Sequence, residues 1–306
     1  KFLLSKTDQI RVVSQRIADS LKAKSYKLKA VLTGCMTHYP VAKLKQRLPY
    51  IDIFIPIKDL PKLPRYLEGY LEAKLPSSNF SPKYQSDFRA YIPISEGCNN
   101  SCSYCIVPYT RGKEVSRPAE EIICEAGRLI KNGYKEIWLI GQNVNSFKSK
   151  VVNFTELLKL VNDIPGNFWL RFTSPHPKDF SDELIKTMTE SEKFAHYLNL
   201  PVQSGDNEIL KKMNRPYTIG KYKELVLKIK KAMPDIALST DVIVGFPGET
   251  KKQFENTAKL FKEIKFDMAY ISQYSPRPGT AASEIPDNVP KQEKKKREYI
   301  LNEILK

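Results

Sequence analysis

The sequence predicts an α/β fold, a partial (β/α)6 barrel of parallel strands with intervening helices, preceded by a smaller α/β unit. Two observations support this prediction. From Arg89 onward, short apolar runs alternate with amphipathic helical patterns, which is typical of a parallel sheet with helical crossovers. A segment rich in Ser and Pro, residues 74–83, comes just before this region, and such a composition marks a connection between domains.

The expected elements of the larger unit follow in order. Its strands are expected at residues 89–94, 137–141, 168–173, 197–202, 236–244 and 268–274. One helix is opened by Pro118 and closed by Asn132-Gly133, and the others are centred on Leu157, Ile185, Leu225 and Leu260.

The two ends of the chain have their own patterns. Residues 10–21 carry a helical stripe, residues 29–34 and 51–55 read as strands, and residues 282–290 form a loop before a charged helix at 291–306. We therefore expect a small N-terminal domain at 1–73, a linker at 74–88, the partial barrel at 89–281, and a closing loop and helix at 282–306. A chain of 306 residues suits two such units.

The composition indicates in which cellular compartment the protein works and which class of partner it binds. Lys and Arg number 50 against 34 Asp and Glu, a net charge of +16, which suits a polyanion such as a nucleic acid; the alternative is a basic surface that is merely solvated. No apolar run approaches the roughly 20 residues that span a bilayer. The first residues are too short for a signal peptide. We expect a cytoplasmic protein without a membrane partner, in which clustered thiols bind metal.

Three of the five cysteines lie in one loop after the first barrel strand. Cys98, Cys102 and Cys105 are spaced C-x3-C-x2-C. Iron–sulfur clusters are held by cysteine thiolates, and a closed cluster takes four. Three thiolates would leave one iron of a 4Fe–4S cluster open to a small molecule. A zinc site would need a fourth ligand, and none is adjacent, so a zinc knuckle with a remote ligand is the alternative.

Small and polar residues follow several of the other strands. In parallel sheets the loops after the carboxyl ends of the strands form the active site. The candidates there are Gly141, Gln142, Asn143, Gln203, Ser204, Val244 and Gly245, together with the arginines Arg111, Arg117, Arg171 and Arg215. Arginine can bind a carboxylate or a phosphate with two N–H groups, and the resemblance described below implies that at least one of these arginines binds cofactor and the others RNA.

The cysteine loop resembles that of the radical S-adenosylmethionine (SAM) superfamily, including the aromatic Tyr104 before the third cysteine. The resemblance implies that the open iron chelates the methionine part of SAM, that Tyr104 lies near the adenine, and that reductive cleavage gives a 5′-deoxyadenosyl radical. It further implies a cofactor site made by the strand-end residues named above and Arg215.

A longer resemblance is to the radical SAM methylthiotransferases, in particular to the tRNA branch (the MiaB type). It is carried by residues 98–118, 141–146, 173–177, 200–205, 213–218 and 274–280. It implies 2-methylthiolation of N6-isopentenyladenosine beside the anticodon, with a tRNA anticodon stem-loop, SAM and an electron donor such as a flavodoxin or ferredoxin as partners of a monomer. The alternatives are a related enzyme acting on threonylcarbamoyladenosine or on a ribosomal-protein aspartate, and a non-catalytic RNA-binding protein with a structural metal.

The same family carries a second 4Fe–4S cluster on three cysteines of its N-terminal domain. Cys35 matches the third of these cysteines, and the first two have no counterpart in this sequence. The RNA-binding TRAM domain that follows the last helix in the family is also absent from it. We therefore expect a fragment of a longer enzyme, with Cys35 as a cluster ligand; a plain buried thiol is the alternative for Cys35.

Other residues carry weaker signals. His176, in a loop after a strand, could touch RNA or cofactor or could stabilise its loop. Cys124 lies in an amphipathic helix and is expected to pack in the core. The lysines and arginine at 291–297, together with Lys211 and Lys212, are expected to be charges that are solvated or that contact a nucleic-acid backbone.

Overall fold

The computed structural model describes residues 30–63 and 86–306. The helix expected at residues 10–21 and most of the linker expected at 74–88 lie outside the described residues. The domain limits stay predictions.

Six strands form two parallel sheets of three, in the orders β3-β6-β9 and β10-β11-β12. A parallel bridge between Leu170 and Phe194 connects the first sheet to the segment that leads into the second. The strands are β3 (Arg89–Pro93), β6 (Glu136–Ile140), β9 (Trp169–Phe172), β10 (Tyr197–Asn199), β11 (Ala237–Val244) and β12 (Met268–Gln273). This arrangement confirms the expected α/β partial barrel.

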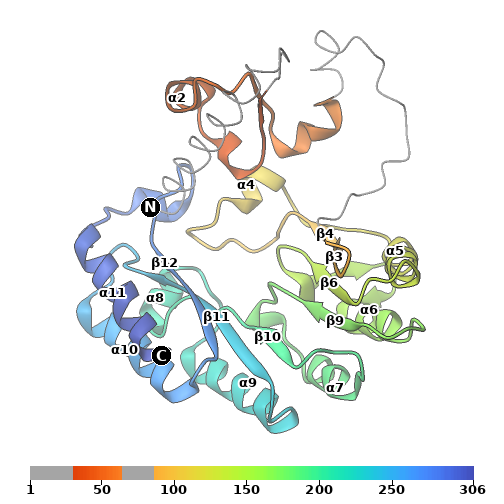
Figure 1. The fold of residues 1–306 in the computed structure, drawn as a ribbon. Helices are drawn as coiled ribbons and strands as arrows, with labels where there is room; N and C mark the ends of the chain where they lie inside the picture. Colours follow the sequence, from red (N-terminus) through yellow and green to blue (C-terminus); the bar gives the residue numbers. More distant parts are fainter. Residues whose placement is uncertain (1–29, 64–85) are drawn as a thin grey trace.

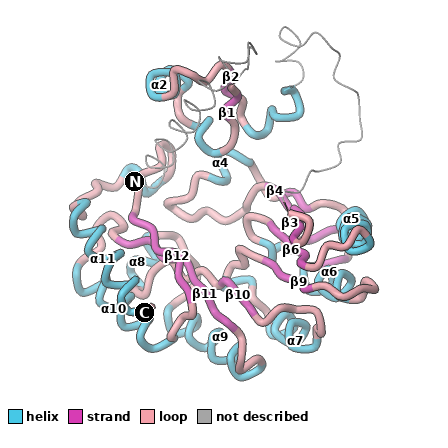
Figure 2. The backbone as a smooth tube through the Cα atoms, in the orientation of Figure 1, coloured by secondary structure: helices cyan, strands magenta, loops and turns pink. Residues whose placement is uncertain are grey.

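Helices cover the outer side of both sheets. Figure 1 shows α5, α6 and α7 outside the first three strands and α9, α10 and α11 outside the second three. In Figure 2 the strands accordingly form an inner arc within a ring of helices. The helices are α5 (Ala119–Lys131), α6 (Phe154–Asn162), α7 (Asp182–Glu190), α9 (Ile219–Ala232), α10 (Lys251–Ile264) and α11 (Lys291–Ile304).

Local sequence signals explain where these helices begin. Asn153 and Glu156 form a capping box at the start of α6, and Thr250 and Gln253 form another at the start of α10. Each box satisfies backbone N–H groups that the first helical turn leaves without partners. Glu120, with Glu121, lies in the first turn of α5, where the helix dipole favours negative charge.

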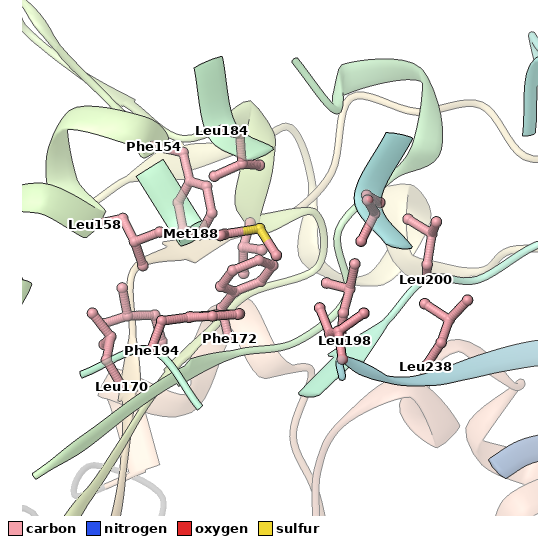
Figure 3. Packing of buried hydrophobic residues seen from close by; sticks show 14 of the residues in the cluster. Phe154, Leu158, Leu170, Phe172, Leu184, Met188, Phe194, Leu198, Leu200 and Leu238 are labelled. Atoms are coloured by element: carbon pink, nitrogen blue, oxygen red, sulfur yellow. The ribbon is translucent and has the colours of Figure 1, made fainter. Parts of the chain in front are cut away.

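The main core lies between the sheets and the helices. Figure 3 shows Phe154, Leu170, Phe172 and Phe194 packing together. The rings of Phe154 and Phe172 meet edge to face at 5.1 Å between centroids, and both side chains are at most 2% exposed. Burying a side chain of this kind contributes about 1.5–3 kcal/mol. The core therefore fixes the strands whose ends carry the candidate site.

The N-terminal unit is small. Its strands β1 (Val31–Leu32) and β2 (Ile53–Phe54) pair in parallel, and between them lie a 3-10 helix, η1 (Cys35–His38), and α2 (Val41–Arg47). A second 3-10 helix, η2 (Ile57–Lys62), follows. Both η1 and η2 contact α4 (Val107–Arg111), the short helix that comes after the cysteine loop. The unit is thereby docked beside that loop (Figure 1).

Several short elements had no sequence prediction. They are α4, the helix α8 (Asn207–Lys212), the hairpins β4–β5 (Ser95–Glu96, Val115–Ser116) and β7–β8 (Lys148–Ser149, Val152–Asn153), and the 3-10 turns η3 (Val144–Ser146), η4 (Pro177–Asp179) and η5 (Ala281–Glu284). Elements of two to six residues are too short to show a period.

The interpretation of α11 as a solvated charged helix is wrong for two side chains. Lys294 is 5% exposed and Arg297 is 4% exposed. Lys294 pairs with Asp287 at 2.7 Å, and Arg297 pairs with the buried Glu249 at 2.7 Å. Buried charges of this kind persist only when they are paired. Asp287 lies in the loop just before α11, whereas Glu249 comes from a loop that is far from α11 in sequence. Arg297 thereby ties α11 to the loop after β11.

Among residues 30–63 and 86–306, no helix combines the length and the apolar character needed to cross a membrane.

Candidate functional site

The cysteine loop leaves the carboxyl end of β3 through β4 and returns in α4. Gly97 opens it with φ of +78°, and a Cβ there would lie 2.2 Å from the backbone oxygen of Lys113. Only glycine tolerates both the left-handed backbone and this close approach. The Cys98 N–H donates to the carbonyl of Gly112 at 3.2 Å. The loop is therefore closed at its base, so that its thiols are held together.

Segments from distant strand ends also pin the loop. The backbone carbonyl of Ser103 accepts a hydrogen bond from the Ala282 N–H at 2.8 Å, and the Ser103 N–H donates to the carbonyl of Met213 at 3.0 Å. The side-chain amide of Asn214 donates to the carbonyl of Ser101 at 2.7 Å. The segment after α8 and the segment after β12 thus both hold the middle of the cysteine loop.

The three thiols of this loop are free and partly or fully buried. Burial raises the pKa of Cys98 and raises the pKa of Cys105 to about 11. The neighbouring Cys102 adds to both shifts, and Cys98 and Cys35 add to that of Cys105, because a thiolate disfavours a second one nearby. Converging thiols of this kind are the donor set that an iron–sulfur cluster requires, since binding of the metal releases their protons.

Within the described ranges, no three His, Cys, Asp or Glu side chains lie close enough to hold one metal ion. A zinc ion draws its thiolates to about 2.3 Å from a single centre. A 4Fe–4S cluster instead takes one thiolate on each of its irons, so its ligands lie farther apart.

Arg215 lies directly against this donor set. It is 8% exposed, and its Nη1 donates to the Sγ of Cys102 at 3.6 Å. Its Nε donates to the Tyr217 hydroxyl at 3.0 Å, and its Nη2 to the carbonyl of Pro201 at 3.1 Å. The guanidinium is thus oriented by Tyr217 and Pro201 on one side and directs an N–H at the Cys102 thiol on the other.

Three buried polar atoms at neighbouring strand ends have no hydrogen-bond partner. They are Ser95 Oγ, Asn143 Oδ1 and His176 Nε2, after β3, β6 and β9 respectively. Each residue is at most 6% exposed. A buried polar atom without a partner costs free energy, so these atoms fit a polar ligand at this end of the barrel.

The loop of His176 is fixed by the loop of Asn143. Asn145 exchanges two hydrogen bonds with the backbone of His176, at 2.8 and 3.0 Å. Asn143 donates its amide to Asp179 at 2.9 Å, which leaves its Oδ1 as an unpaired acceptor. Both roles that the sequence left open for His176 are therefore compatible: its backbone stabilises the loop, and its ring retains a free atom.

The tautomer of His176 follows from its hydrogen bond. Its Nδ1 accepts the N–H of Lys178 at 3.2 Å, so the proton of a neutral ring lies on Nε2. Burial, together with the positive charges of Arg215 and Lys178, lowers the pKa of His176 to about 3. At neutral pH the ring thus presents a neutral Nε2–H donor that has no acceptor.

The other strand-end candidates differ in their surroundings. A Cβ on Gly141 would lie 2.8 Å from Ser95 Oγ, so this glycine admits the Ser95 side chain. Gln142 is half-buried and adjoins it. Gln203 has φ of +70°, and Ser204 is fully buried and accepts the Asp206 N–H at 3.2 Å.

Gly245, which follows the buried Val244, packs against α11. Its N–H donates to Glu249 at 2.6 Å, and a Cβ there would lie 2.4 Å from Lys294. The close approach that this glycine allows is therefore to Lys294. Tyr104, inside the cysteine loop, packs against a small apolar cluster made by Ile209, Met213, Phe246, Tyr274 and Ala282.

Cys35 comes to the same place from the N-terminal unit. It begins η1, which contacts α4, and the Thr110 hydroxyl of α4 donates to its Sγ at 3.8 Å. The charge of Cys35 also contributes to raising the pKa of Cys105, which agrees with this position. The structure thus brings together four cysteines that are separated by up to 70 residues in sequence.

The remaining candidates lie in ion pairs or on the surface. Arg111 approaches Glu96 at 3.9 Å, Arg117 pairs with Glu125 at 2.9 Å, and Arg171 pairs with Glu136 at 2.7 Å. The prediction that Cys124 packs in the core is wrong, because Cys124 is exposed. The buried stripe of α5 runs through Ala119, Ile122, Ala126 and Leu129, and residue 124 faces away from it at 100° per residue.

Comparison with known proteins agrees with this geometry. The model of the radical SAM superfamily matches residues 92–261. The fold resembles a radical SAM methyltransferase from Kitasatospora setae (TM-score 0.54, 19% identity, 63% of this chain and 38% of that one). It also resembles a cobalamin-dependent SAM radical enzyme (TM-score 0.60, 10% identity, 97% of this chain and 46% of that one). The fold and the three-cysteine loop therefore define an enzyme of the radical SAM superfamily.

Sequence relatives resolve the branch. The chain is 44% identical to a tRNA-2-methylthio-N(6)-dimethylallyladenosine synthase from Clostridium botulinum, over 94% of this chain and 68% of that protein. It is 38% identical to a protein of the same name from Neisseria gonorrhoeae, over 93% of this chain and 68% of that protein. The chain belongs to this family of radical SAM tRNA methylthiotransferases.

Proposed function

We propose that the protein converts N6-dimethylallyladenosine (also called isopentenyladenosine) beside the anticodon of tRNA to its 2-methylthio derivative. The observation that supports this most is the position of Cys35 beside the Cys98–Cys105 loop. Sulfur insertion by this family needs a radical-generating centre and a sulfur-handling centre close to one substrate. The identity of 38–44% to relatives named for this reaction favours the dimethylallyl branch over the threonylcarbamoyl and ribosomal-protein alternatives.

In this proposal Cys98, Cys102 and Cys105 hold a 4Fe–4S cluster whose fourth iron is open to SAM. When bound, the cluster supplies the electron that cleaves SAM, and the radical so formed activates the C2–H bond of the adenine. The residues of this chain do the rest. They hold three thiolates in one closed loop, orient the cofactor and exclude water from the end of the barrel.

The unpaired polar atoms suggest how SAM is oriented. The methionine part of SAM carries an ammonium donor and a carboxylate acceptor. Asn143 Oδ1 is a free acceptor, and His176 Nε2–H is a free donor. We propose that these two atoms face SAM or the adenosine, with Gly141 and Gln142 beside them and Tyr104 near the adenine. Gln203, Ser204, Val244 and Gly245 complete the proposed cofactor loops from the second sheet.

The second centre is proposed at Cys35. A cluster there would be one of the two 4Fe–4S clusters of the family, and Cys35 is the residue of this chain that we propose as its ligand. The further partners that we propose are an electron donor such as a flavodoxin or ferredoxin and the tRNA stem-loop, with the enzyme acting as a monomer in the cytoplasm, where tRNA and reduced thiols are found.

The experiment that tests the radical chemistry uses Cys102→Ala. The full chain is reconstituted anaerobically with iron and sulfide, reduced, and assayed for 5′-deoxyadenosine. Cys102→Ala should abolish the product and the broad iron–sulfur absorption near roughly 400 nm, because two thiolates do not hold a cuboidal cluster.

Cys124→Ala is the matched control, since Cys124 is an exposed thiol on α5, outside the loop. It should retain wild-type iron content and product formation. Undiminished 5′-deoxyadenosine from Cys102→Ala, or zinc as the only bound metal in the wild-type chain, would overturn the proposed function.

A further inference from the structure

A cavity of about 660 Å3 lies between the N-terminal unit and the segment that follows β12. One wall is formed by η1 and α2, and the other by residues 275–284. Its volume is within the range of about 300–1,000 Å3 that small-molecule and cofactor sites occupy. None of the strand-end residues proposed above for the cofactor lines this cavity.

Both walls of the cavity are joined to the cysteine segments. Met36, which lines it, directly follows Cys35. On the opposite wall, the Ala282 N–H donates to the carbonyl of Ser103 inside the cysteine loop at 2.8 Å. The two walls also meet each other, because a Cβ on Gly279 would lie 2.9 Å from His38 Nε2. A ligand in the cavity would therefore lie next to the proposed reaction site.

The polar part of the lining is mainly positive. Lys43 and Arg47 lie one turn apart on α2, and Arg277 lies on the opposite wall. None of the three forms an ion pair with any residue that the structure describes, and Glu284 is the one acid among the lining residues. Three cations outside any such ion pair, against a single acid in the same lining, favour an anionic ligand.

Arg277 is held in place for such a contact. Its carbonyl accepts the Thr280 N–H at 3.0 Å and the Thr280 hydroxyl at 2.7 Å, which closes a tight turn. Its Nη1 donates to the Ser275 hydroxyl at 3.4 Å. A guanidinium has five N–H donors, so Arg277 has donors left to bind phosphate oxygens.

Most of the remaining lining is apolar. Leu44 is 3% exposed and Leu48 is 1% exposed, and Met36, Pro276 and Pro278 complete the apolar surface. A cavity with an apolar wall and a cationic rim suits a ligand that has a flat apolar part and a negative charge. A nucleotide of a single-stranded RNA loop has both, because its base can be buried while its phosphate is bound by cations.

We propose that this cavity binds a nucleotide of the RNA loop that flanks the reacting adenosine, with its base against the Leu44 wall and its phosphate on Arg277 and Lys43. The proposal rests on the proposed function, because it takes RNA as the substrate. It assigns RNA contact to the junction of the N-terminal unit and the segment after β12. That junction would position the loop so that the neighbouring adenosine reaches the cysteine loop.

The test is the salt dependence of RNA binding by the reconstituted full chain. The probe is a fluorescent RNA stem-loop with an unpaired purine-rich loop, titrated by anisotropy at several KCl concentrations. Arg277→Ala and Lys43→Ala should each weaken binding about 5- to 10-fold and reduce the slope of log K against log[salt] by about 0.7, the value for one phosphate contact on a single strand. Arg277→Lys should retain most of the slope.

Lys231→Ala is the matched control. Lys231 is exposed in the last turn of α9, and this helix leads into the amino end of β11. It forms no ion pair with the described residues, and it lies at the opposite end of the strands from the cysteine loop. Its affinity and slope should stay near those of wild type. Ultraviolet crosslinking followed by peptide mass spectrometry should place the RNA on residues 36–48 or 275–284.

The outcomes separate the two proposals. Wild-type binding that Arg277→Ala and Lys43→Ala leave as tight and as salt-dependent as Lys231→Ala would overturn the cavity assignment and leave the proposed function standing. Crosslinks confined to other segments would overturn it as well. If the wild-type chain does not bind the stem-loop at any salt concentration, both proposals fall together.

Discussion

At the scale of single residues, the contact between Arg215 and Cys102 has a consequence for the electron that starts the chemistry. An N–H donor aimed at a cluster thiolate stabilises the reduced, more negative state. The guanidinium is 8% exposed, so water screens this effect little.

We therefore expect Arg215→Met to lower the midpoint potential of the cluster on Cys102. A lost contact of about 1.4 kcal/mol in differential stabilisation corresponds to about 60 mV for one electron. Potentiometric titration followed by electron paramagnetic resonance measures it. Arg215→Lys keeps the charge and should restore part of the shift; identical potentials in wild type and Arg215→Met would show that the contact has no such role.

The buried ring of His176 gives a second prediction, on stability against pH. Because its pKa is near 3 in the folded state and near 6.5 otherwise, the unfolded chain binds the proton first as pH falls. The free energy of unfolding should therefore decline between about pH 6.5 and pH 3, by up to about 1.4 kcal/mol per pH unit.

His176→Asn removes this titration and keeps an acceptor for the Lys178 N–H, as an N-cap Asn does. Urea denaturation at pH 7.5 and pH 5 should show a smaller loss of stability in the variant than in wild type. An equal loss in both would mean that His176 is not protected from protonation.

At the scale of elements, the cysteine loop depends on the glycine that opens it. Gly97 and Gly112 have nearly the same positive φ, +78° and +79°. A Cβ on Gly97 would collide with the carbonyl oxygen of Lys113, whereas a Cβ on Gly112 would meet nothing within 4 Å. Comparing an alanine at Gly97 with an alanine at Gly112 therefore separates the effect of the steric clash from the effect of backbone strain.

Gly97→Ala should therefore lose most of its reconstituted iron, while Gly112→Ala should keep iron near the wild-type content at a cost of about 1 kcal/mol in stability. Iron and sulfide analysis measures the first quantity, and thermal unfolding measures the second. Equal iron contents in the two variants would mean that the approach of Gly97 to Lys113 does not shape the loop.

Some of these elements could be predicted from the sequence and others could not. The six strands and the long helices were predictable, because each has a period or a capping signal of its own, as Asn153 and Thr250 do. The cysteine loop was predictable because its three cysteines lie within eight residues of one another in the sequence. Short elements such as α4 and α8 have no such signal.

Other features of the site arise only from tertiary contacts. Nothing local announces that Asn145 holds His176, that Arg215 donates to Cys102, or that Arg297 pairs with Glu249. The errors have the same origin. The lysine-rich run of α11 suggests solvated side chains unless the loop acids that face it are known. The burial of Cys124 can be predicted only when it is known which side of α5 packs against the rest of the protein.

At the scale of the whole molecule, the fold brings the cysteine thiols and the strand-end candidate residues to one end of the barrel. The cysteine loop, the unpaired atoms of Asn143 and His176, and the segment after β12 all follow the carboxyl ends of strands. The N-terminal unit adds Cys35 to the same end through η1 and α4. This convergence is what the proposed function requires, because one adenosine must meet both a radical source and a sulfur source.

The measurement that tests this account most directly is nucleoside mass spectrometry of tRNA from cells that lack the gene. The account predicts that the 2-methylthio-N6-dimethylallyladenosine signal disappears, that N6-dimethylallyladenosine accumulates, and that a copy of the gene restores the original pattern while a Cys102→Ala copy does not. An unchanged level of the methylthio nucleoside in the deleted strain would contradict it.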